Sequence, residues 1–368
     1  MISSTLTTTS SQARPTYASH GTGAIRAWLY IVALLVAALV LVGGATRLTN
    51  SGLSITEWKP IHGVIPPLSL QEWQEEFALY QRIPEYREIN QGMSLDAFKS
   101  IYWWEWTHRF LARAVGFVFA LPLIIFWIKG RIPPTLKPRL VGILALGAVQ
   151  GGIGWWMVAS GLSERTDVSQ YRLAVHLTTA CVIFAYTLWV ARGLAPHSRD
   201  VPPSADSVWA AGGIVMLALC QIYLGGLVAG LDAGQGYNTW PLMAGQWVPD
   251  GLLAISPAWR NFFENAMTVQ FMHRMGAYVL FIVTFIHAAA ALWLGAGTTH
   301  ARRAVVLFLM VALQAGLGIT TLLLHVPLGF ALAHQMGAIA LLAFAVAHAR
   351  GLKGTYEFTP TRRVKDVF

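Results

Sequence analysis

Four histidines lie at matching positions in apolar stretches of the sequence: His108, His176, His273 and His334. Each is expected within the first turns of an even-numbered membrane helix, so all four rings should lie at a similar depth near one membrane face. A lone histidine in a helix bundle is more often a hydrogen-bonded bundle residue than a ligand. Because an ionisable residue inside a membrane is costly, four of them at matched positions nevertheless indicate ligation.

Haem suits these histidines better than zinc does. Zinc prefers four ligands from histidine, cysteine or carboxylate, whereas the sequence offers one histidine pair in each half and no thiolate near either pair. Each pair can hold a haem iron between two helices of its own bundle. The neighbouring helices carry Gly151, Gly152, Gly154, Gly316 and Gly318. These small residues would leave room for flat macrocycles, although close helix packing explains them equally.

A carboxylate distinguishes the two halves. Glu105 lies three residues before His108, one turn away on the same helix face, whereas Gln270 lies three residues before His273. A carboxylate can accept a proton or stabilise a developing cation, and an amide of the same shape cannot. The first half is therefore predicted to be catalytic and the second to be a cofactor site. The alternative is that Glu105 only forms an ion pair with Arg109.

An arginine directly follows one histidine of each pair. Arg109 follows His108, and Arg274 follows His273. Their guanidinium groups can pair with haem propionates at the outer interface, or can extend to lipid phosphates instead. Both roles place the arginines at the membrane surface.

These matches belong to an internal repeat. The matched pairs are 105–109 with 270–274, 150–154 with 314–318, His176 with His334, and Gly43-Gly44 with Gly225-Gly226. Each repeat holds four predicted membrane helices. Because four is an even number, the repeats share one orientation and are predicted to be parallel, related by an axis along the membrane normal.

The composition is that of a membrane protein. Hydrophobic residues make up 55% of the 368 positions and charged residues 12%, which is more apolar and less charged than a soluble domain. Eight predominantly apolar runs, each with at most one charged residue, reach the length of about 20 residues that a bilayer requires. They are Trp28–Ala45, Phe110–Ile128, Leu140–Val158, Leu173–Val190, Ala210–Val228, Phe271–Leu294, Ala304–Leu324 and Leu328–Ala347. The only cysteines, Cys181 and Cys220, fall within these runs and are predicted to be small buried residues without a disulfide.

The distribution of charge orients the chain. Of the 26 lysines and arginines, 15 lie on the side that holds both termini. By the positive-inside rule both termini are cytoplasmic, the long first loop is external, and the net charge of +9 does not indicate a nucleic-acid partner. The predicted architecture is an all-α integral membrane protein of eight transmembrane helices in two four-helix bundles. Its predicted parts are a disordered tail 1–23, a first repeat 24–195 with an external loop 47–102, a linker 196–208, a second repeat 209–350 and a tail 351–368.

The external loop contains a predicted amphipathic helix. Ser69 and Glu72 form a capping box ahead of Leu70, Trp73 and Phe77, which recur at helical spacing. The helix is expected at the outer interface, either as an anchor or as a lid over a site beneath it.

A second histidine pattern supports a different function. His287 lies 14 residues after His273, and His348 lies 14 residues after His334, a distance of about 21 Å along nearly the same helix face. These two histidines could hold a further haem near the cytoplasmic side. The protein would then be a transmembrane electron-transfer cytochrome of the b type.

Several motifs together resemble the haem A synthase family. They are the segment Gly43–Ser54, its continuation through Glu57–Pro60 and Gly63–Pro67, the Glu105–Arg109 motif, and the positions of His176, His273 and His334. The resemblance extends from about Trp28 to Leu352 and is to the proteobacterial and mitochondrial variant. Some family members have a cysteine pair in external loops, and this sequence has none there.

The resemblance implies a division of labour. His273 and His334 would bind a resident haem b as cofactor, while His108 and His176 would hold the substrate, haem O, with Glu105 required for reaction. The implied reaction oxidises a ring methyl to a formyl group by successive hydroxylations, with water as the oxygen source.

The resemblance also implies partners and a location. Haem O synthase and cytochrome oxidase assembly factors are the implied protein partners, homo-oligomers can form, and lipid surrounds the chain. The expected location is a bacterial inner membrane, because the segment before the first helix is short for a mitochondrial import signal. A haem transporter or chaperone remains a third alternative. Neither it nor the electron-transfer cytochrome requires a carboxylate in one repeat only.

Overall fold

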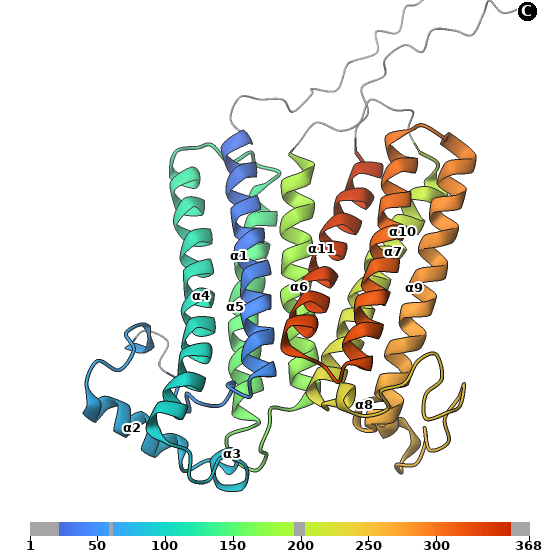
Figure 1. Ribbon diagram of the computed structural model, residues 1–368. Helices are drawn as coiled ribbons and strands as arrows, with labels where there is room; N and C mark the ends of the chain where they lie inside the picture. Colours follow the sequence, from blue (N-terminus) through green and yellow to red (C-terminus); the bar gives the residue numbers. More distant parts are fainter. Residues whose placement is uncertain (1–21, 59–61, 195–202, 355–368) are drawn as a thin grey trace, which may run out of the picture.

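Eight long helices form the body of the computed structural model, which describes residues 22–58, 62–194 and 203–354 (Figure 1). They are α1 (Thr22–Leu48), α4 (Leu95–Ile128), α5 (Lys137–Ala159), α6 (Gln170–Gly193), α7 (Ala205–Gly230), α9 (Ala266–Gly295), α10 (Thr299–Leu323) and α11 (Leu328–Leu352). By length and composition, all eight can cross a membrane. The eight predicted spans are thus confirmed, each lying almost entirely within one of these helices.

Short helices fill the connections at one end of the bundle. They are η1 (His62–Val64), α2 (Leu70–Tyr80), α3 (Pro84–Glu88), η2 (Ala233–Gln235), η3 (Ala258–Arg260) and α8 (Asn261–Glu264). Figure 1 shows α2, α3 and α8 at this end, while α1 begins and α11 ends at the opposite end. The predicted tails 1–23 and 351–368 and the predicted linker 196–208 lie mostly outside the described residues.

The long helices of each predicted repeat contact one another, whereas their division into two four-helix bundles stays a prediction. Helices α1, α4, α5 and α6 pack together, as do α7, α9, α10 and α11, and α6 joins the groups by packing against α7 and α11 (Figure 1). Within each group, corresponding pairs are in contact: α1 with α4 corresponds to α7 with α9, and α5 with α6 to α10 with α11. That the repeats are related by an axis along the membrane normal stays a prediction.

Buried aliphatic side chains hold the two groups together. One apolar cluster includes Leu29 of α1, Cys181 of α6, Ile214 of α7 and Leu342 of α11. The outward faces instead expose large apolar residues such as Trp293, which is 91% exposed. A helix with apolar side chains both inside and outside is what a lipid environment selects.

The amphipathic helix of the external loop forms as predicted. In α2 the Ser69 side chain accepts a hydrogen bond from the Glu72 backbone N–H, and the Glu72 carboxylate accepts one from the Ser69 N–H, which completes the capping box. Trp73 and Phe77 pack against the outer end of α4, where the Trp73 ring lies 4.9 Å from that of Tyr102. The helix is therefore fixed to α4 by its apolar face.

Candidate haem sites

The histidine pair of the second half is arranged as two ligands of one metal would be. His273 on α9 and His334 on α11 have ring centroids 6.5 Å apart and ring planes at 78°. Two imidazoles that bind opposite sides of one metal, with metal–nitrogen distances of about 2.0–2.1 Å, have centroids roughly 6 Å apart. The predicted pair is thus brought together at a separation that fits haem iron.

A glutamine from a neighbouring helix contacts each of these rings. Gln221 of α7 has its amide nitrogen 3.1 Å from Nδ1 of His273, and the same nitrogen donates to the His273 carbonyl oxygen at 2.8 Å. It also lies 3.4 Å from Nε2, so it faces the ring edge between the two nitrogens. Gln314 of α10 makes the same two contacts with His334, at 3.1 Å to Nδ1 and 2.7 Å to the carbonyl oxygen. Each histidine is therefore fixed at both its ring and its backbone.

Glycines leave the space that these rings occupy. A Cβ atom at Gly318 would lie 2.8 Å from Cε1 of His334, and one at Gly225 would lie 3.3 Å from Cε1 of His273. Carbon atoms in favourable contact are about 3.5–4.0 Å apart. The glycines therefore allow the helix backbones to approach the rings.

The first half repeats this arrangement in part. His108 on α4 and His176 on α6 lie close enough to interact electrostatically. Gln150 of α5 places its amide nitrogen 3.0 Å from Nδ1 of His176 and donates to the His176 carbonyl oxygen at 2.9 Å. A Cβ at Gly154 would lie 2.9 Å from Cε1 of His176. His108 has no such glutamine among the described residues.

That the other glycines leave room for a flat macrocycle stays a prediction. Gly151, Gly152 and Gly316 have nothing within 4 Å of an added Cβ. Residues two apart in an α-helix point to nearly opposite sides, so Gly152 and Gly316 lie on the face opposite to Gly154 and Gly318. Of these five glycines, Gly154 and Gly318 are the two that lie against a histidine ring.

Glu105 is buried and fully hydrogen-bonded. It is 2% exposed. Its Oε1 accepts from Arg109 at 2.6 Å, and its Oε2 accepts from the Ser54 hydroxyl and the Ile55 backbone N–H, both at 2.8 Å. Arg109 in turn donates to the carbonyl oxygens of Ile55 and Glu57. The ion pair considered as an alternative role for Glu105 is therefore present, and it joins α4 to the loop that follows α1.

Gln270 has the same place in the second half. Its Nε2 donates to the carbonyl oxygens of Ala233 and Gly236, and its Oε1 accepts from Arg274 at 2.7 Å. Arg274 also donates to the carbonyl oxygens of Tyr237 and Thr239. The two arginines thus bind loop carbonyls in equivalent ways. Their predicted contacts with haem propionates stay a prediction.

The other histidine pair does not have the geometry of a haem site. His287 of α9 and His348 of α11 lie together as the spacing predicts, but their Nε2 atoms are only 2.9 Å apart and hydrogen-bonded to each other. A shared metal would require a nitrogen–nitrogen separation of about 4 Å. One ring of this pair donates to the other, at a separation that does not favour a further haem there.

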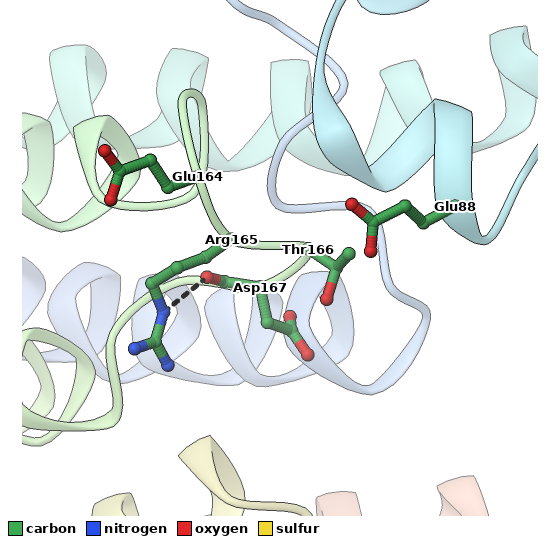
Figure 2. A pocket seen from close by; sticks show the side chains of 5 residues that line it. All are labelled: Glu88, Glu164, Arg165, Thr166 and Asp167. Carbon is green, nitrogen blue, oxygen red and sulfur yellow. Dashed lines mark hydrogen bonds between the residues drawn. The ribbon is translucent and has the colours of Figure 1, made fainter.

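Charged residues connect the two halves at the end of the bundle that carries α2, α3 and α8. Arg47 at the end of α1 bonds to Asp167 at 3.2 Å and to Asp232 at 2.8 Å, so it joins the loop before α6 to the loop after α7. Asp167 also lines a polar hollow with Glu88, Glu164, Arg165 and Thr166 (Figure 2).

One carboxyl beside this hollow is buried. Glu85 of α3 is 5% exposed, and its Oε2 has no hydrogen-bond partner. Burial, reinforced by the nearby carboxylates of Asp167 and Glu105, raises the pKa of Glu85 to about 8. This end of the bundle thus holds a protonatable group close to Glu105.

Two expectations about single residues need correction or addition. Cys181 is buried as predicted, whereas Cys220 is exposed because it lies on the outward face of α7. Gln221 was not predicted to contact a ligand. The signal that identifies it is a glutamine four residues before the ring-contacting glycine, which occurs at 150–154, 221–225 and 314–318.

The chain is similar in sequence to several known proteins over most of its length. Residues 26–346 match the family described as cytochrome oxidase assembly protein, COX15-CtaA. The heme A synthase of Rhizobium meliloti is 62% identical over 332 residues, which cover 90% of each chain. That of Allorhizobium ampelinum is 63% identical over 92% of this chain and 93% of its own. That of a Chelativorans species is 64% identical over 91% of this chain and 92% of its own. The chain therefore belongs to the haem A synthase family of cytochrome oxidase assembly proteins.

Proposed function

We propose that this chain converts haem O to haem A by oxidising one ring methyl to a formyl group. The observation that carries the proposal is a pair of similar histidine sites at the same end of the bundle, of which only the first has a carboxylate one turn before the histidine. The relatives named heme A synthase support it. In the net reaction the methyl group and one water give the formyl group, four protons and four electrons.

The two sites divide the work. His108 and His176 hold the iron of haem O, the substrate, and His273 and His334 hold a resident haem b. The resident haem supplies one-electron transfer, which carries electrons from the substrate to a one-electron acceptor. The 6.5 Å between the ring centroids of His273 and His334 supports a bis-histidine site there.

Glu105 acts beside the substrate as a fixed negative charge. Its four acceptor contacts come from Arg109, Ser54 and Ile55, so the carboxylate is held in one orientation. A charge fixed in this way can stabilise a cation that develops on the methyl carbon without reorganising during the reaction. Water then adds to that carbon, and the released protons leave toward the external end.

The chain is proposed to lie in a bacterial inner membrane with both termini cytoplasmic and both haem sites near the external face. Haem O synthase is the proposed source of substrate, and cytochrome oxidase assembly factors receive the product. The cluster of short external helices would then cover the sites from the aqueous side. Homo-oligomers remain compatible with this arrangement.

The test uses a host that makes haem O but no haem A. The chain and its variants are expressed, and the haems are extracted and separated. Wild type should yield haem A, Glu105→Ala should lose haem A while retaining haem b, and His273→Ala should lose haem b. Glu264→Gln is the control, because Glu264 also pairs with an arginine four residues away, Arg260, but its hydrogen bonds go to Arg260 and Tyr171 and not to a candidate ligand histidine.

Two results would contradict the proposal. Haem O left unchanged by the wild-type chain, with haem b bound, would favour electron transfer alone. Haem A formation by Glu105→Ala at the wild-type level per folded protein would show that the reaction does not require Glu105. Its role would then be limited to the ion pair with Arg109.

A further inference from the structure

The contacts between glutamines and histidines form a repeated device with one exception. A glutamine precedes the ring-contacting glycine by four residues in α5, α7 and α10. In α1 the ring-contacting glycine is Gly43, and the residue four positions before it is Leu39. Residues four apart lie on one helix face. Leu39 therefore occupies the place from which a glutamine would reach His108.

The three glutamines share a feature which indicates that they act on the neighbouring histidine rings. The Oε1 atoms of Gln150, Gln221 and Gln314 are buried, and none has a hydrogen-bond partner among the described residues. A buried amide oxygen without a partner is unfavourable because it has lost its hydrogen bonds to water. Once iron binds Nε2 of a neutral imidazole, Nδ1 carries the proton and needs an acceptor. A rotation of the amide brings Oε1 to that proton, so metal binding would satisfy the oxygen, and the bond from Nε2 to the histidine carbonyl oxygen would be given up in exchange.

The second half makes room for this oxygen. A Cβ at Gly276 would lie 2.3 Å from Oε1 of Gln221, and a Cβ at Gly337 would lie 2.2 Å from Oε1 of Gln314. Both glycines lie three residues after the histidine on its own helix. Each glutamine amide is therefore enclosed between the ring and the glycine that follows it.

The His108 ring is placed differently. A Cβ at Gly43 would lie closest to Nε2 of His108, at 3.0 Å, whereas at Gly154, Gly225 and Gly318 the closest atom is Cε1. The described residues make no hydrogen bond to the His108 ring. This ring is thus turned relative to the other three and is fixed by packing alone.

We propose that Gln150, Gln221 and Gln314 are positioning residues that fix the iron-binding rings of His176, His273 and His334, and that His108, which lacks such a residue, is the exchangeable ligand. This inference rests on the proposed function. A resident haem needs two fixed ligands, because it stays bound. A substrate that must enter and leave needs one fixed ligand and one that can turn away. The distribution of glutamines, two in the second half and one in the first, matches that requirement.

The first experiment tests the second half. Purified full-length Gln221→Leu and Gln314→Leu are compared with Gln335→Leu, whose glutamine donates to the Val40 carbonyl oxygen on α1 and makes no hydrogen bond to a histidine ring among the described residues. Removing a group that orients a metal ligand typically weakens binding about 10- to 100-fold. Loss of haem b to apomyoglobin should therefore be faster by about that factor in the first two variants and unchanged in the control.

A conservative variant separates positioning from folding. Gln221→Glu keeps the size of the side chain and places a stronger acceptor near Nδ1 of His273. The added negative charge favours ferric over ferrous haem, so the midpoint potential of the resident haem should fall. Gln335→Glu adds the same charge without a hydrogen bond to a histidine ring, so a glutamine that served helix packing alone would give no larger fall in Gln221→Glu than in Gln335→Glu.

The second experiment tests the first half with haem O as the probe. Leu39→Gln supplies the missing glutamine and should slow the release of haem O to apomyoglobin, while Gln150→Leu should accelerate it. Leu39→Met is the control, because it has nearly the same length and cannot form the hydrogen bond. Equal release rates for Leu39→Gln and Leu39→Met would overturn the assignment of His108 as the exchangeable ligand.

Failure of this inference can be told from failure of the proposed function. If wild type forms haem A but all glutamine variants match the corresponding Gln335 variants in haem loss and midpoint potential, only the inference is wrong. If wild type forms no haem A but Gln221 and Gln314 variants still shift the spectrum and potential of the bound haem, the synthase proposal is wrong and the positioning role stands.

Discussion

Replacing either of two glycines of α10 by alanine should have opposite consequences. Gly316 and Gly318 are two residues apart on one helix and point to opposite faces. A Cβ at Gly316 has nothing within 4 Å, whereas a Cβ at Gly318 would lie 2.8 Å from Cε1 of His334. The pair therefore tests ring placement with helix propensity held constant.

The distances set the expected size of the effect. To restore a carbon–carbon contact of about 3.5 Å, the ring of His334 would have to move by about 0.7 Å. It cannot turn away freely, because Gln314 holds it at Nδ1 and at the carbonyl oxygen. Ligand distances in metal sites vary by only about 0.2 Å. The shift would therefore weaken or break the bond from His334 to iron.

The effects on stability also differ. Alanine in place of glycine stabilises a helix interior by about 0.5–1 kcal/mol, a gain that both variants share. Overpacking offsets it by about 1–3 kcal/mol in Gly318→Ala alone. Gly316→Ala should thus be neutral or more stable than wild type, and Gly318→Ala should have the lower Tm of the two.

The assay measures haem per protein, the reduced-minus-oxidised spectrum and the thermal unfolding of each variant purified in detergent. Gly318→Ala should lose haem or show the spectrum of a five-coordinate iron, and Gly316→Ala should match wild type. Equal haem content and identical spectra for the two variants would refute the assignment of His334 as an iron ligand packed on Gly318.

Three further outcomes follow from single contacts. Since Glu85 has a pKa of about 8 when folded and an ordinary value of 4.5, the stability of the protein is expected to fall as the pH rises between these values. Glu85→Gln should flatten that part of the Tm-versus-pH curve, and an unchanged slope would contradict the burial of Glu85. His287→Phe leaves Nε2 of His348 without its partner and should lower stability by about 1–3 kcal/mol without changing the haem-to-protein ratio. Loss of one haem in this variant would instead support the electron-transfer cytochrome. Ser69→Ala removes the N-cap of α2, which contributes about 1 kcal/mol, so limited proteolysis of the loop between α1 and α4 should become faster. A rate equal to that of wild type would show that packing on α4 alone holds the helix.

The membrane spans could be predicted because an apolar run of sufficient length specifies a spanning helix without knowledge of its neighbours. The helix ends could not be. Helix α4 begins at Leu95 rather than Phe110, because its outer turns carry Asp96 and Lys99 and are therefore not apolar. Ser94 caps this extension by accepting from the Ala97 N–H. Charged residues that continue a helix into water are invisible to a search for apolar runs.

The site was predictable where a single residue type carries the signal. An intramembrane histidine stands out in one sequence, and the structure brings His273 and His334 together at a separation suited to iron. A glutamine does not stand out, because its role depends on a glycine one turn later and on a histidine of another helix. The pattern of glutamine and glycine becomes visible only when α5, α7 and α10 are aligned on the ring that each contacts.

The difference between Glu105 and Gln270 can be explained by the loops that these side chains contact, apart from any role in catalysis. At Glu105 the loop presents two donors, the Ser54 hydroxyl and the Ile55 N–H, whereas at Gln270 it presents two carbonyl acceptors. The local turn of each loop is therefore sufficient to select an acid in one repeat and an amide in the other.

Catalysis consequently needs support beyond this one difference, and the absence of a glutamine opposite His108 supplies it. That second asymmetry arises on α1, independently of the loops, and it falls in the same half of the molecule as Glu105. A half that holds its carboxylate rigidly while leaving one ligand ring unrestrained has the features of a site where a substrate turns over. The half with two restrained rings and no carboxylate has those of a site where a cofactor stays.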